Sequence, residues 1–343
     1  MRFPGFEGEW QEKCFGEIAP LQRGFDLPTQ NIKKGNIPIV YSNGILNYHN
    51  ESKCKAPGLI TGRSGTIGRF TFIESGEYWP HNTALWVTDF CNNYPYFIYY
   101  LYQTANIDRL STGSGVPTLN RNDVHRKISY IPSIIEQKKI TDFLSLLDDR
   151  ISTQMKIIEK LESLIKGVAH SLIKNGKANI QIKDCLNCFS STLMESMIPE
   201  NNDGKYPVYG AIGVIGYMNE NTINTDAILI IKDGASVGRV QYAEGKYSVT
   251  GTLNYLTPKD KTSLKYMYYC LQLFNFDKYK VGSGIPHIYF KDYGHEYIYR
   301  PSFEKQKEIA SVLSTIDEKL GIERKVLEKY AEQKEHLLCN LFI

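Results

Sequence analysis

The sequence of 343 residues lacks several features that define whole classes of protein. No apolar run approaches the roughly 20 residues needed to cross a bilayer, and the start MRFPGFEGEW does not resemble a signal peptide. The seven cysteines are odd in number and scattered through both halves, which predicts reduced thiols. Neither sign of charge dominates, and a net charge of +3 permits a nucleic-acid partner without requiring one. We therefore expect a cytoplasmic protein that does not bind membranes.

Patterns that carry chemistry are also scarce. Cys185 and Cys188 form a CxxC pair, but no second pair follows to complete a zinc site, and the histidines are dispersed. Gly62, Gly65 and Gly68 match neither a Walker A loop nor a dinucleotide fingerprint. The stretch NNYPY lacks the second proline of the Asn-Pro-Pro-Tyr loop of amino-methyltransferases. We expect no metal site on this chain.

What the sequence does contain is an internal repeat. The segments PSIIEQKKITDFLSLLDDRIS and PSFEKQKEIASVLSTIDEKLG align without a gap, so that Pro132 matches Pro301 and Gln137 matches Gln306. Each segment opens about forty residues with a heptad spacing of apolar side chains, which predicts a helix of about 60 Å. Two such helices in one chain can pair in parallel or antiparallel, and the duplication favours an antiparallel coiled-coil pair related by a pseudo-two-fold axis.

The apolar seams of the two helices differ in regularity. The first seam consists of Ile140, Leu144, Leu147, Ile151, Ile158, Leu161, Ile165, Val168 and Leu172, with Gln154 in the missing position. The second consists of Ile309, Leu313, Ile316, Leu320, Leu327, Leu337 and Leu341, interrupted by Glu323, Tyr330 and Lys334. Gln154 and Glu323 occupy equivalent positions and either fix the register of the pair or point to solvent. Ser133 with Glu136 predicts a capping box at the first helix start, whereas the second start keeps only the Ser302 cap and the favourable Glu304.

The globular parts repeat as well. IPIVYSNGILNYHN and YPVYGAIGVIGYMN both predict a strand, a glycine turn and a second strand. GLITGRSGTIGRFTFI and ILIIKDGASVGRVQYA predict a second type of hairpin, whose tip is either a DNA-reading loop or a solvated turn. YPYFIYYLYQT and LKYMYYCLQLF predict a buried helix that supports a sheet, in preference to a base-stacking platform.

The most closely repeated loop motif is STGSGVPTLNRNDV, which recurs as KVGSGIPHIYFKDY. The glycine and proline frame is shared, but the side chains that it carries differ between the copies. Two domains that recognise two different DNA sequences need a shared backbone frame with different side chains. The first copy gives as candidate DNA-binding residues Arg63, Ser64, Thr66, Thr118, Asn120 and Arg121. The second copy gives Lys232, Asp233, Ser236, His287, Tyr289 and Lys291.

The order of these segments resembles the specificity (S) subunit of Type I restriction-modification systems. The resemblance covers essentially the whole chain and rests on GEWQEKCFGEIAPLQRGFDLP, GRSGTIGR, GSGVPTLNRNDV and the two helix starts. It implies an α+β protein with two homologous mixed α/β target recognition domains, at residues 1–131 and 176–300. It implies helical spacers at residues 132–175 and 301–343. The chain is shorter than the family average, and its second seam is less regular.

The same resemblance implies a function. Each recognition domain would read one half of a split, asymmetric site in double-stranded DNA, while the helices set the spacer and dock two methyltransferase (M) subunits. The chain would be noncatalytic and carry no cofactor. S-adenosylmethionine for adenine-N6 methylation would bind to the M subunits. ATP and Mg would serve restriction (R) subunits, where a system has them, in DNA translocation and cleavage.

Two alternatives stay open. One is a stand-alone DNA methyltransferase, against which the absent Asn-Pro-Pro-Tyr loop and the absent cofactor fold argue. The other is a protein-only coiled-coil scaffold, which would not depend on the side chains of the repeated loops.

Overall fold

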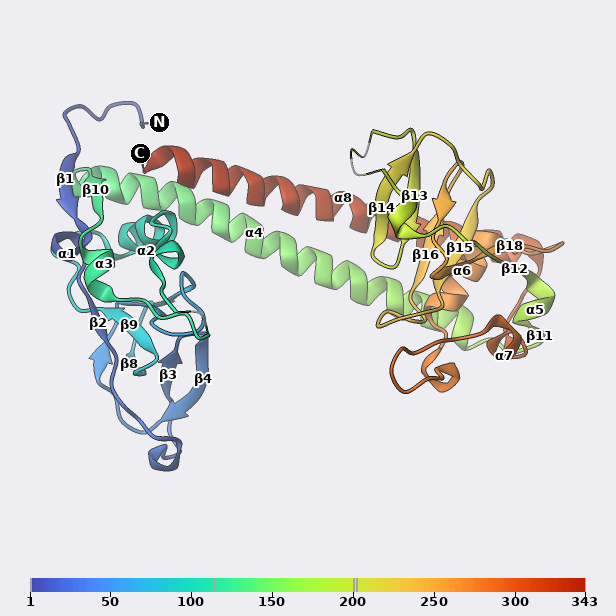
Figure 1. Ribbon diagram of the computed structural model, residues 1–343, viewed down its shortest axis with the longest axis horizontal. Helices are drawn as coiled ribbons and strands as arrows, with labels where there is room; N and C mark the ends of the chain where they lie inside the picture. Colours follow the sequence, from blue (N-terminus) through green and yellow to red (C-terminus); the bar gives the residue numbers. More distant parts are fainter. Residues whose placement is uncertain (1, 114, 200, 202, 343) are drawn as a thin grey trace. The chain divides into compact units, whose positions relative to one another are not determined.

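The computed structural model describes residues 2–113, 115–199, 201 and 203–342. The chain forms two compact units, Met1–Gln154 with Val326–Ile343, and Met155–Lys325. Each unit combines mixed β-sheets, short helices and parts of two long helices, which are α4 (Ile134–Ala169) and α8 (Phe303–Leu341) (Figure 1). Within the described ranges, no helix has both the length and the apolar character to span a bilayer.

Among its described residues, the first unit has three sheets and three short helices. The helices are α1 (Phe15–Ile18), α2 (Pro95–Thr104) and α3 (Arg121–His125). The strands in sheet order are β1 (Gln11–Cys14) and β10 (Ile128–Ile131); β2 (Leu21–Arg23), β9 (Ala84–Val87), β6 (Gly58–Gly62) and β7 (Phe70–Ile73); and β4 (Gly44–His49), β3 (Ile37–Tyr41), β8 (Glu77–Pro80) and β5 (Cys54–Lys55).

The second unit repeats this plan with one strand fewer in its last sheet, counted over the described residues. Its helices are α5 (Ile182–Cys185), α6 (Leu264–Gln272) and α7 (Phe290–Tyr293). Its strands in sheet order are β11 (Ile180–Gln181) and β19 (Tyr297–Ile298); β12 (Leu186–Ser190), β18 (Leu253–Pro258), β15 (Ala227–Ile231) and β16 (Val240–Ala243); and β14 (Gly213–Met218), β13 (Tyr206–Gly210) and β17 (Ser248–Val249).

The predicted hairpins are confirmed in both units. β3 pairs antiparallel with β4 and β13 with β14, each pair with a register shift at the same repeated position. β6 pairs antiparallel with β7 and β15 with β16. The turns after β3 and β13 need glycine, because Gly44 and Gly213 have φ angles of 110° and 115°.

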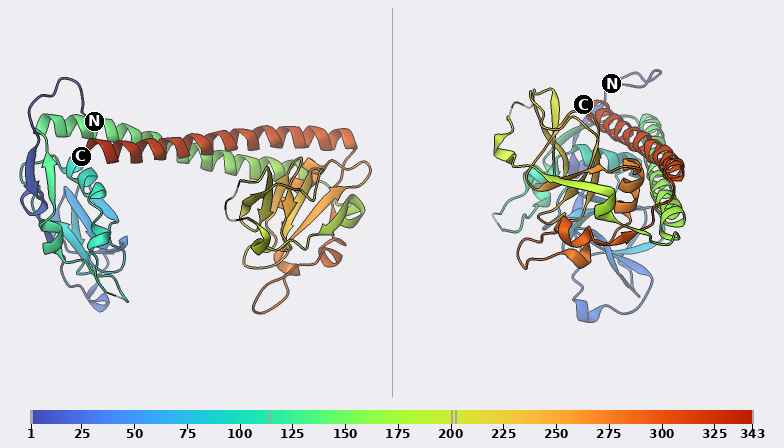
Figure 2. Two further views of the ribbon diagram at one scale, coloured as in Figure 1. Left: turned by 45° about the horizontal axis from the view of Figure 1, so that its top comes forward. Right: turned by 90° about the vertical axis from the view of Figure 1, so that its right-hand side faces the viewer.

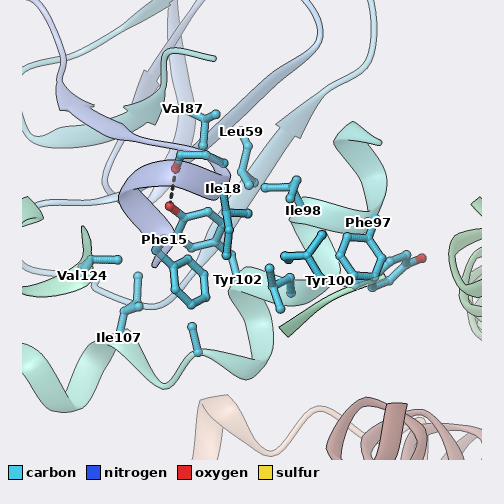
Figure 3. Packing of buried hydrophobic residues seen from close by; sticks show 14 of the residues in the cluster. Phe15, Ile18, Leu59, Val87, Phe97, Ile98, Tyr100, Tyr102, Ile107 and Val124 are labelled. Atoms are coloured by element: carbon cyan, nitrogen blue, oxygen red, sulfur yellow. Dashed lines mark hydrogen bonds between the residues drawn. The ribbon is translucent and has the colours of Figure 1, made fainter. Parts of the chain in front are cut away.

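The aromatic helices α2 and α6 are buried, as predicted. Phe97, Ile98 and Tyr102 of α2 are fully buried in a core that also takes in α1. The Tyr102 hydroxyl donates a 2.6 Å hydrogen bond to the backbone carbonyl of Ala19, which ties α2 to the end of α1 (Figure 3). Apolar residues of α4 and α8 join the same core, so the globular part of the first unit is continuous with its helices.

The two long helices contact each other within each unit, where they lie side by side (Figure 2). In the first unit Lys334 Nζ lies 2.6 Å from the Asp148 carboxylate, and in the second Arg324 lies 2.6 Å from Glu162. Lys334, an interruption in the second seam, therefore has a specific partner. Gln154 is 7% exposed and Glu323 pairs with Lys319, so neither side chain simply points into solvent.

The predicted seam is wrong at Leu172. Residues His170–Lys174 form a π-helical segment at the end of α4, and Leu172 is exposed whereas Ile173 is 5% exposed. A π-helical turn takes more residues than an α-helical turn, so it moves the buried position one residue along the chain. A heptad count assumes an uninterrupted α-helix and cannot register this shift.

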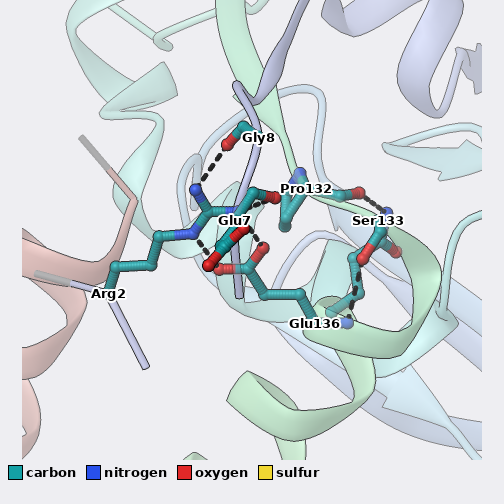
Figure 4. A network of polar contacts seen from close by, with 7 residues as sticks. Arg2, Glu7, Gly8, Pro132, Ser133 and Glu136 are labelled. Atoms are coloured by element: carbon teal, nitrogen blue, oxygen red, sulfur yellow. Dashed lines mark hydrogen bonds and ion pairs between the residues drawn. The ribbon is translucent and has the colours of Figure 1, made fainter. Parts of the chain in front are cut away.

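The starts of the long helices are held by polar contacts. The Ser133 hydroxyl accepts from the Glu136 backbone at 3.4 Å, as a capping residue should. The buried Glu136 carboxylate binds the Arg2 guanidinium with 2.8 and 2.9 Å contacts, a partner that the predicted capping box does not include (Figure 4). This ion pair ties the N-terminal segment to the first turn of α4.

In the same first turn, each long helix carries a buried glutamine. Gln137 Oε1 accepts from the backbone N–H of Tyr94 at 2.9 Å, and its Nε2 donates to Pro132 O at 3.0 Å. Gln306 makes the same two bonds, to the N–H of Ser263 and to Pro301 O, at 2.9 and 3.0 Å. Tyr94 and Ser263 are the N-cap residues of α2 and α6. A repeated glutamine therefore joins the start of a long helix to the start of the buried aromatic helix.

Substitution Gln137→Leu should destabilise the first unit by about 2–4 kcal/mol, because buried backbone groups would lose their partners. Urea unfolding followed by circular dichroism measures the loss. The control Gln333→Leu lies on the exposed face of α8 and should change stability by less than about 0.5 kcal/mol. Equal effects of the two substitutions would contradict a specific role for the buried amide.

Candidate nucleic-acid interface

The two predicted loops meet in the first unit. The hairpin loop (residues 63–69) joins β6 to β7, and the bridge loop (residues 112–120) precedes α3. Ser64 and Thr118 form a β-bridge, and the Leu119 N–H donates to Arg63 O at 2.8 Å. A third bond, from Gly65 N to Pro117 O, is 3.0 Å long. These backbone bonds bring the two sets of candidate residues into one surface.

The second unit builds the same junction from different residues. Its hairpin loop (residues 232–239) joins β15 to β16, and its bridge loop covers residues 281–289. Asp233 and His287 form the equivalent β-bridge, and the Ile288 N–H donates to Lys232 O at 3.0 Å. The bond from Gly234 N to Pro286 O is also 3.0 Å. The backbone frame is thus common to both units, and the side chains on it are not.

The bridge loops close on themselves through a second β-bridge, Thr112 with Thr118 and Val281 with His287. Gly113 and Gly282, at the start of each loop, have φ angles of 111° and 94°, which favour glycine. Ser114, the middle residue of the first Gly-Ser-Gly motif, lies outside the described residues. Paired backbone bonds therefore close each bridge loop at its base and anchor it to the hairpin loop.

A groove of about 610 Å³ opens beside this junction in the first unit. Four candidate residues line it, Arg63, Thr118, Asn120 and Arg121. Ser64 and Thr66 belong to the hairpin loop but are not lining residues of the groove. Arg121 and Asn120 are exposed and Arg63 is half-buried, so two guanidinium groups and an amide are available to a ligand. Guanidinium groups suit phosphates and guanine, and the amide suits adenine.

Strand β2 and the residues just after it supply further groove residues that the repeated motifs did not reveal. Gln22, Arg23 and Asp26 also line the groove, and Arg23 pairs with Asp26 at 2.9 Å. They lie far from the predicted loops in the sequence, in the segment GEWQEKCFGEIAPLQRGFDLP, which carries part of the family resemblance but supplied no candidate DNA-binding residue. Their position follows from the pairing of β2 with β9, which a single sequence does not show.

The local structure also explains the placement of Asn120. It is the N-cap of α3, and its Oδ1 accepts from the Asn122 N–H at 3.0 Å, so the capping bond uses the amide oxygen and not the NH₂ group. His125, at the end of α3, accepts a 2.8 Å bond from the Leu21 N–H through Nε2. α3 is thus capped at one end and tied to β2 at the other.

In the second unit the bridging side chains interact directly. His287 Nδ1 lies 2.6 Å from Asp233 Oδ1, and Lys232 Nζ is 4.0 Å from the other oxygen of that carboxylate. All three side chains are partly exposed. Lys291 lies over the ring of Tyr289 at 5.4 Å from its centroid, and both residues are exposed. Ser236 is exposed on the hairpin loop. The two units therefore present chemically different surfaces on one frame.

The described residues contain no group of three or more His, Cys, Asp or Glu side chains arranged to hold a metal ion. Cys185 is buried, and burial raises the pKa of the Cys188 thiol to about 11. A zinc ligand must be a thiolate, and burial here favours the protonated thiol.

Comparisons with known proteins identify the family. The model of the Type I restriction modification DNA specificity domain matches this chain twice, over residues 7–163 and 175–330. The chain belongs to this family. The two matches agree with the internal repeat, and DNA binding follows from membership of a specificity family.

Individual relatives agree with this assignment. A putative type I specificity subunit of Mycoplasma genitalium is 25% identical over 72% of this chain and 70% of its own length. One from Mycoplasma pneumoniae is 23% identical over 97% of this chain and 96% of its own. The crystal structure of the Type-I restriction-modification system S subunit from M. genitalium covers 100% of this chain and 99% of that chain, with a TM-score of 0.72 at 19% identity. That likeness shows the fold.

The contact between His125 and β2 should make the stability of the first unit depend on pH. Burial, together with the positive charge of Arg121, lowers the pKa of His125 below its ordinary value of 6.5. The unfolded chain therefore binds the proton more readily, and stability is lost as the pH falls below about 6.5. The His125→Gln variant should show a smaller loss in thermal midpoint between pH 7.5 and pH 5.

The matched control for this comparison is His336→Gln, an exposed position on α8. Its midpoint should follow that of the wild type across the same pH range. A His125→Gln variant with the wild-type pH dependence would show that this imidazole is not the titrating group.

Proposed function

We propose that this chain is the noncatalytic DNA-reading subunit of a Type I restriction-modification complex, and that each unit reads one half of a bipartite, asymmetric DNA site. The observation that carries the proposal is the repeated junction of hairpin and bridge loops. Its backbone bonds recur in both units, while the side chains at the bridge change from Ser64 and Thr118 to Asp233 and His287. A common frame with unlike side chains suits two readers of unlike sequences.

The candidate residues divide between the two half-sites. The first half-site is assigned to the groove residues Arg63, Thr118, Asn120 and Arg121. Ser64 and Thr66, which lie with Arg63 on the hairpin loop, are assigned to it as well. Lys232, Asp233, Ser236, His287, Tyr289 and Lys291 serve the second. Arginine can pair bidentately with guanine and asparagine with adenine, whereas an aspartate can accept from cytosine. The two sets therefore favour different bases.

We further propose that residues 1–131 and 176–300 are the two recognition domains and that residues 132–175 and 301–343 are helical spacers. An antiparallel, pseudo-two-fold coiled coil of these helices would set the distance between the half-sites. The ion pairs Asp148–Lys334 and Glu162–Arg324 support this, because the partner number in α8 falls as the number in α4 rises. Gln154 and Glu323 would fix the register.

The partners in this proposal are double-stranded DNA, two M subunits and, where the system contains them, two R subunits. The M subunits would bind S-adenosylmethionine and methylate adenine, and the R subunits would use ATP and Mg. A solved structure that covers 97% of this chain, with a TM-score of 0.55 at 14% identity, concerns complex assembly and conformational transition of the type I R-M system. That structure supports the fold, and the family supports the choice of partners.

The deciding experiment is to co-express the chain with its cognate methyltransferase and to map methyladenine in the DNA of the host. A split motif with two unlike halves is expected. Exchanging residues 176–300 for those of a relative should change only the second half. Methyl transfer by the purified chain alone would instead indicate a stand-alone methyltransferase.

Two substitutions in the first unit test the reading role. Arg121→Gln and Asn120→Ser, of which the second retains a capping oxygen for α3, should each weaken discrimination at one base pair of the first half-site by about 1–3 kcal/mol. The second half should stay unchanged. Methylation rates on plasmids that differ at single positions give the measurement.

Lys138→Gln, on the exposed part of α4, removes one positive charge outside the loops and provides the control. It should leave the recognised sequence intact. An unchanged sequence preference in all three variants would favour the protein-only scaffold.

A further inference from the structure

The turns of the β3–β4 and β13–β14 hairpins lie beside the reading loops in both units. In the first unit the Ser42 N–H donates to Thr83 Oγ1 at 3.4 Å, and the backbone carbonyl of Thr83 accepts from Arg63 N at 2.8 Å. A Cβ placed on Gly62 would lie 3.2 Å from Ser42 Cβ and would also meet Thr66 O. Ser42 is thus adjacent to the base of the hairpin loop.

The second unit repeats the connection. The Thr250 N–H donates to Tyr209 O, one residue from the β13–β14 turn, as the His81 N–H donates to Val40 O in the first unit. Thr252 O accepts from Lys232 N at 3.0 Å, and the Thr250 and Thr252 hydroxyls lie 2.8 Å apart. In each unit a short segment therefore links the turn of the first hairpin (β3–β4 or β13–β14) to the hairpin loop.

The two turns carry different side chains at their tips. The first presents Ser42 and Asn43, and the second presents Ala211 and Ile212. Asn43 is exposed, and Ile212 is 78% exposed, the highest fraction among the exposed large apolar side chains of the described chain. A solvent-exposed isoleucine at the tip of a hairpin does not stabilise the fold, because an apolar side chain contributes to stability when it is buried. Its placement suggests a contact that forms on binding.

We infer that these turns are a third base-reading element of each unit, an inference that rests on the proposed function. Asn43 would offer an amide to adenine in the first half-site, and Ile212 would offer an apolar contact to the methyl group of thymine in the second. Both contacts are among those by which side chains distinguish bases in the major groove. The change from asparagine to isoleucine follows the same pattern as the change from Thr118 to His287 on the shared frame.

The experiment uses the complex of the chain with its methyltransferase and a set of duplexes that vary each base pair of the mapped site. Ile212→Ala and Ile212→Asn should each reduce discrimination at one base pair of the second half-site by about 5- to 100-fold, the range of a single lost base contact. The first half-site should be read as before. Asn43→Ala should act in the same way on the first half alone.

The control Tyr217→Ala changes another exposed apolar residue, towards the far end of β14, and should preserve all discrimination. Unchanged discrimination in both Ile212 variants would overturn the inference, as would an equal loss at both half-sites, which indicates a contact with the methyltransferase. If the wild type itself gives no split motif, the proposed function fails. A split motif that is insensitive to Ile212 and Asn43 refutes the third element alone.

Discussion

Each unit depends on a buried amide at the first turn of a long helix. Gln137 and Gln306 accept from the N-terminus of the aromatic helix and donate to the carbonyl of the proline that precedes the long helix. A buried amide is costly unless its hydrogen bonds are made, and only one placement of the two helices makes them all. The globular part of each unit is therefore fixed on its own stretch of long helix by geometry as well as by apolar packing.

This arrangement lets the reading surface change without loss of the fold. The bonds that join the hairpin loop to the bridge loop run between backbone groups, such as Leu119 N to Arg63 O and Ile288 N to Lys232 O. Backbone bonds are indifferent to the side chains that project from them. Threonine can therefore be exchanged for histidine at the bridge while the loop keeps its shape. The two units can therefore differ in the DNA sequence that they recognise, because the differing side chains do not pack in the core.

Much of this fold could be predicted from one sequence, and the reasons are local. The long helices, the glycine hairpins and the buried aromatic helices each follow from periodicity and turn residues, and the repeat states each of them twice. The π-helical segment at His170–Lys174 escapes a heptad count, which is why Leu172 was assigned to the wrong face. The Arg2–Glu136 ion pair and the Asp233–His287 contact join residues far apart in the sequence, and no local pattern specifies such pairs.

Some residues of the candidate site could likewise be predicted from the sequence, and others could not. The loops that carry Arg63, Asn120 and Arg121 could be found because the repeat keeps their glycines and prolines. The contribution of β2 to the groove depends on its pairing with β9, and the link between the β13–β14 turn and the hairpin loop depends on the short segment with Thr250 and Thr252. Both follow from strand order, which a sequence pattern does not encode. The differences between the two copies indicated which loops are candidates for DNA recognition. Only the tertiary structure shows which other residues lie beside those loops.

Polar groups at the contact of the long helices also fix the position of one element against another. Asp148 of α4 accepts from the Tyr100 hydroxyl at 2.7 Å and pairs with Lys334 at 2.6 Å, so that α2, α4 and α8 meet at one carboxylate. Burial and this bond raise the pKa of Tyr100, which keeps the phenol protonated as a donor. A partly buried ion pair adds little net stability, because desolvation offsets much of the attraction, but breaking it leaves a charge without a partner. Lys334 thus interrupts the apolar seam, but its ion pair restricts which part of α8 can lie against Asp148. The irregular second seam is consistent with a helix whose position is selected by such polar contacts, where a uniform leucine seam would permit sliding by a heptad.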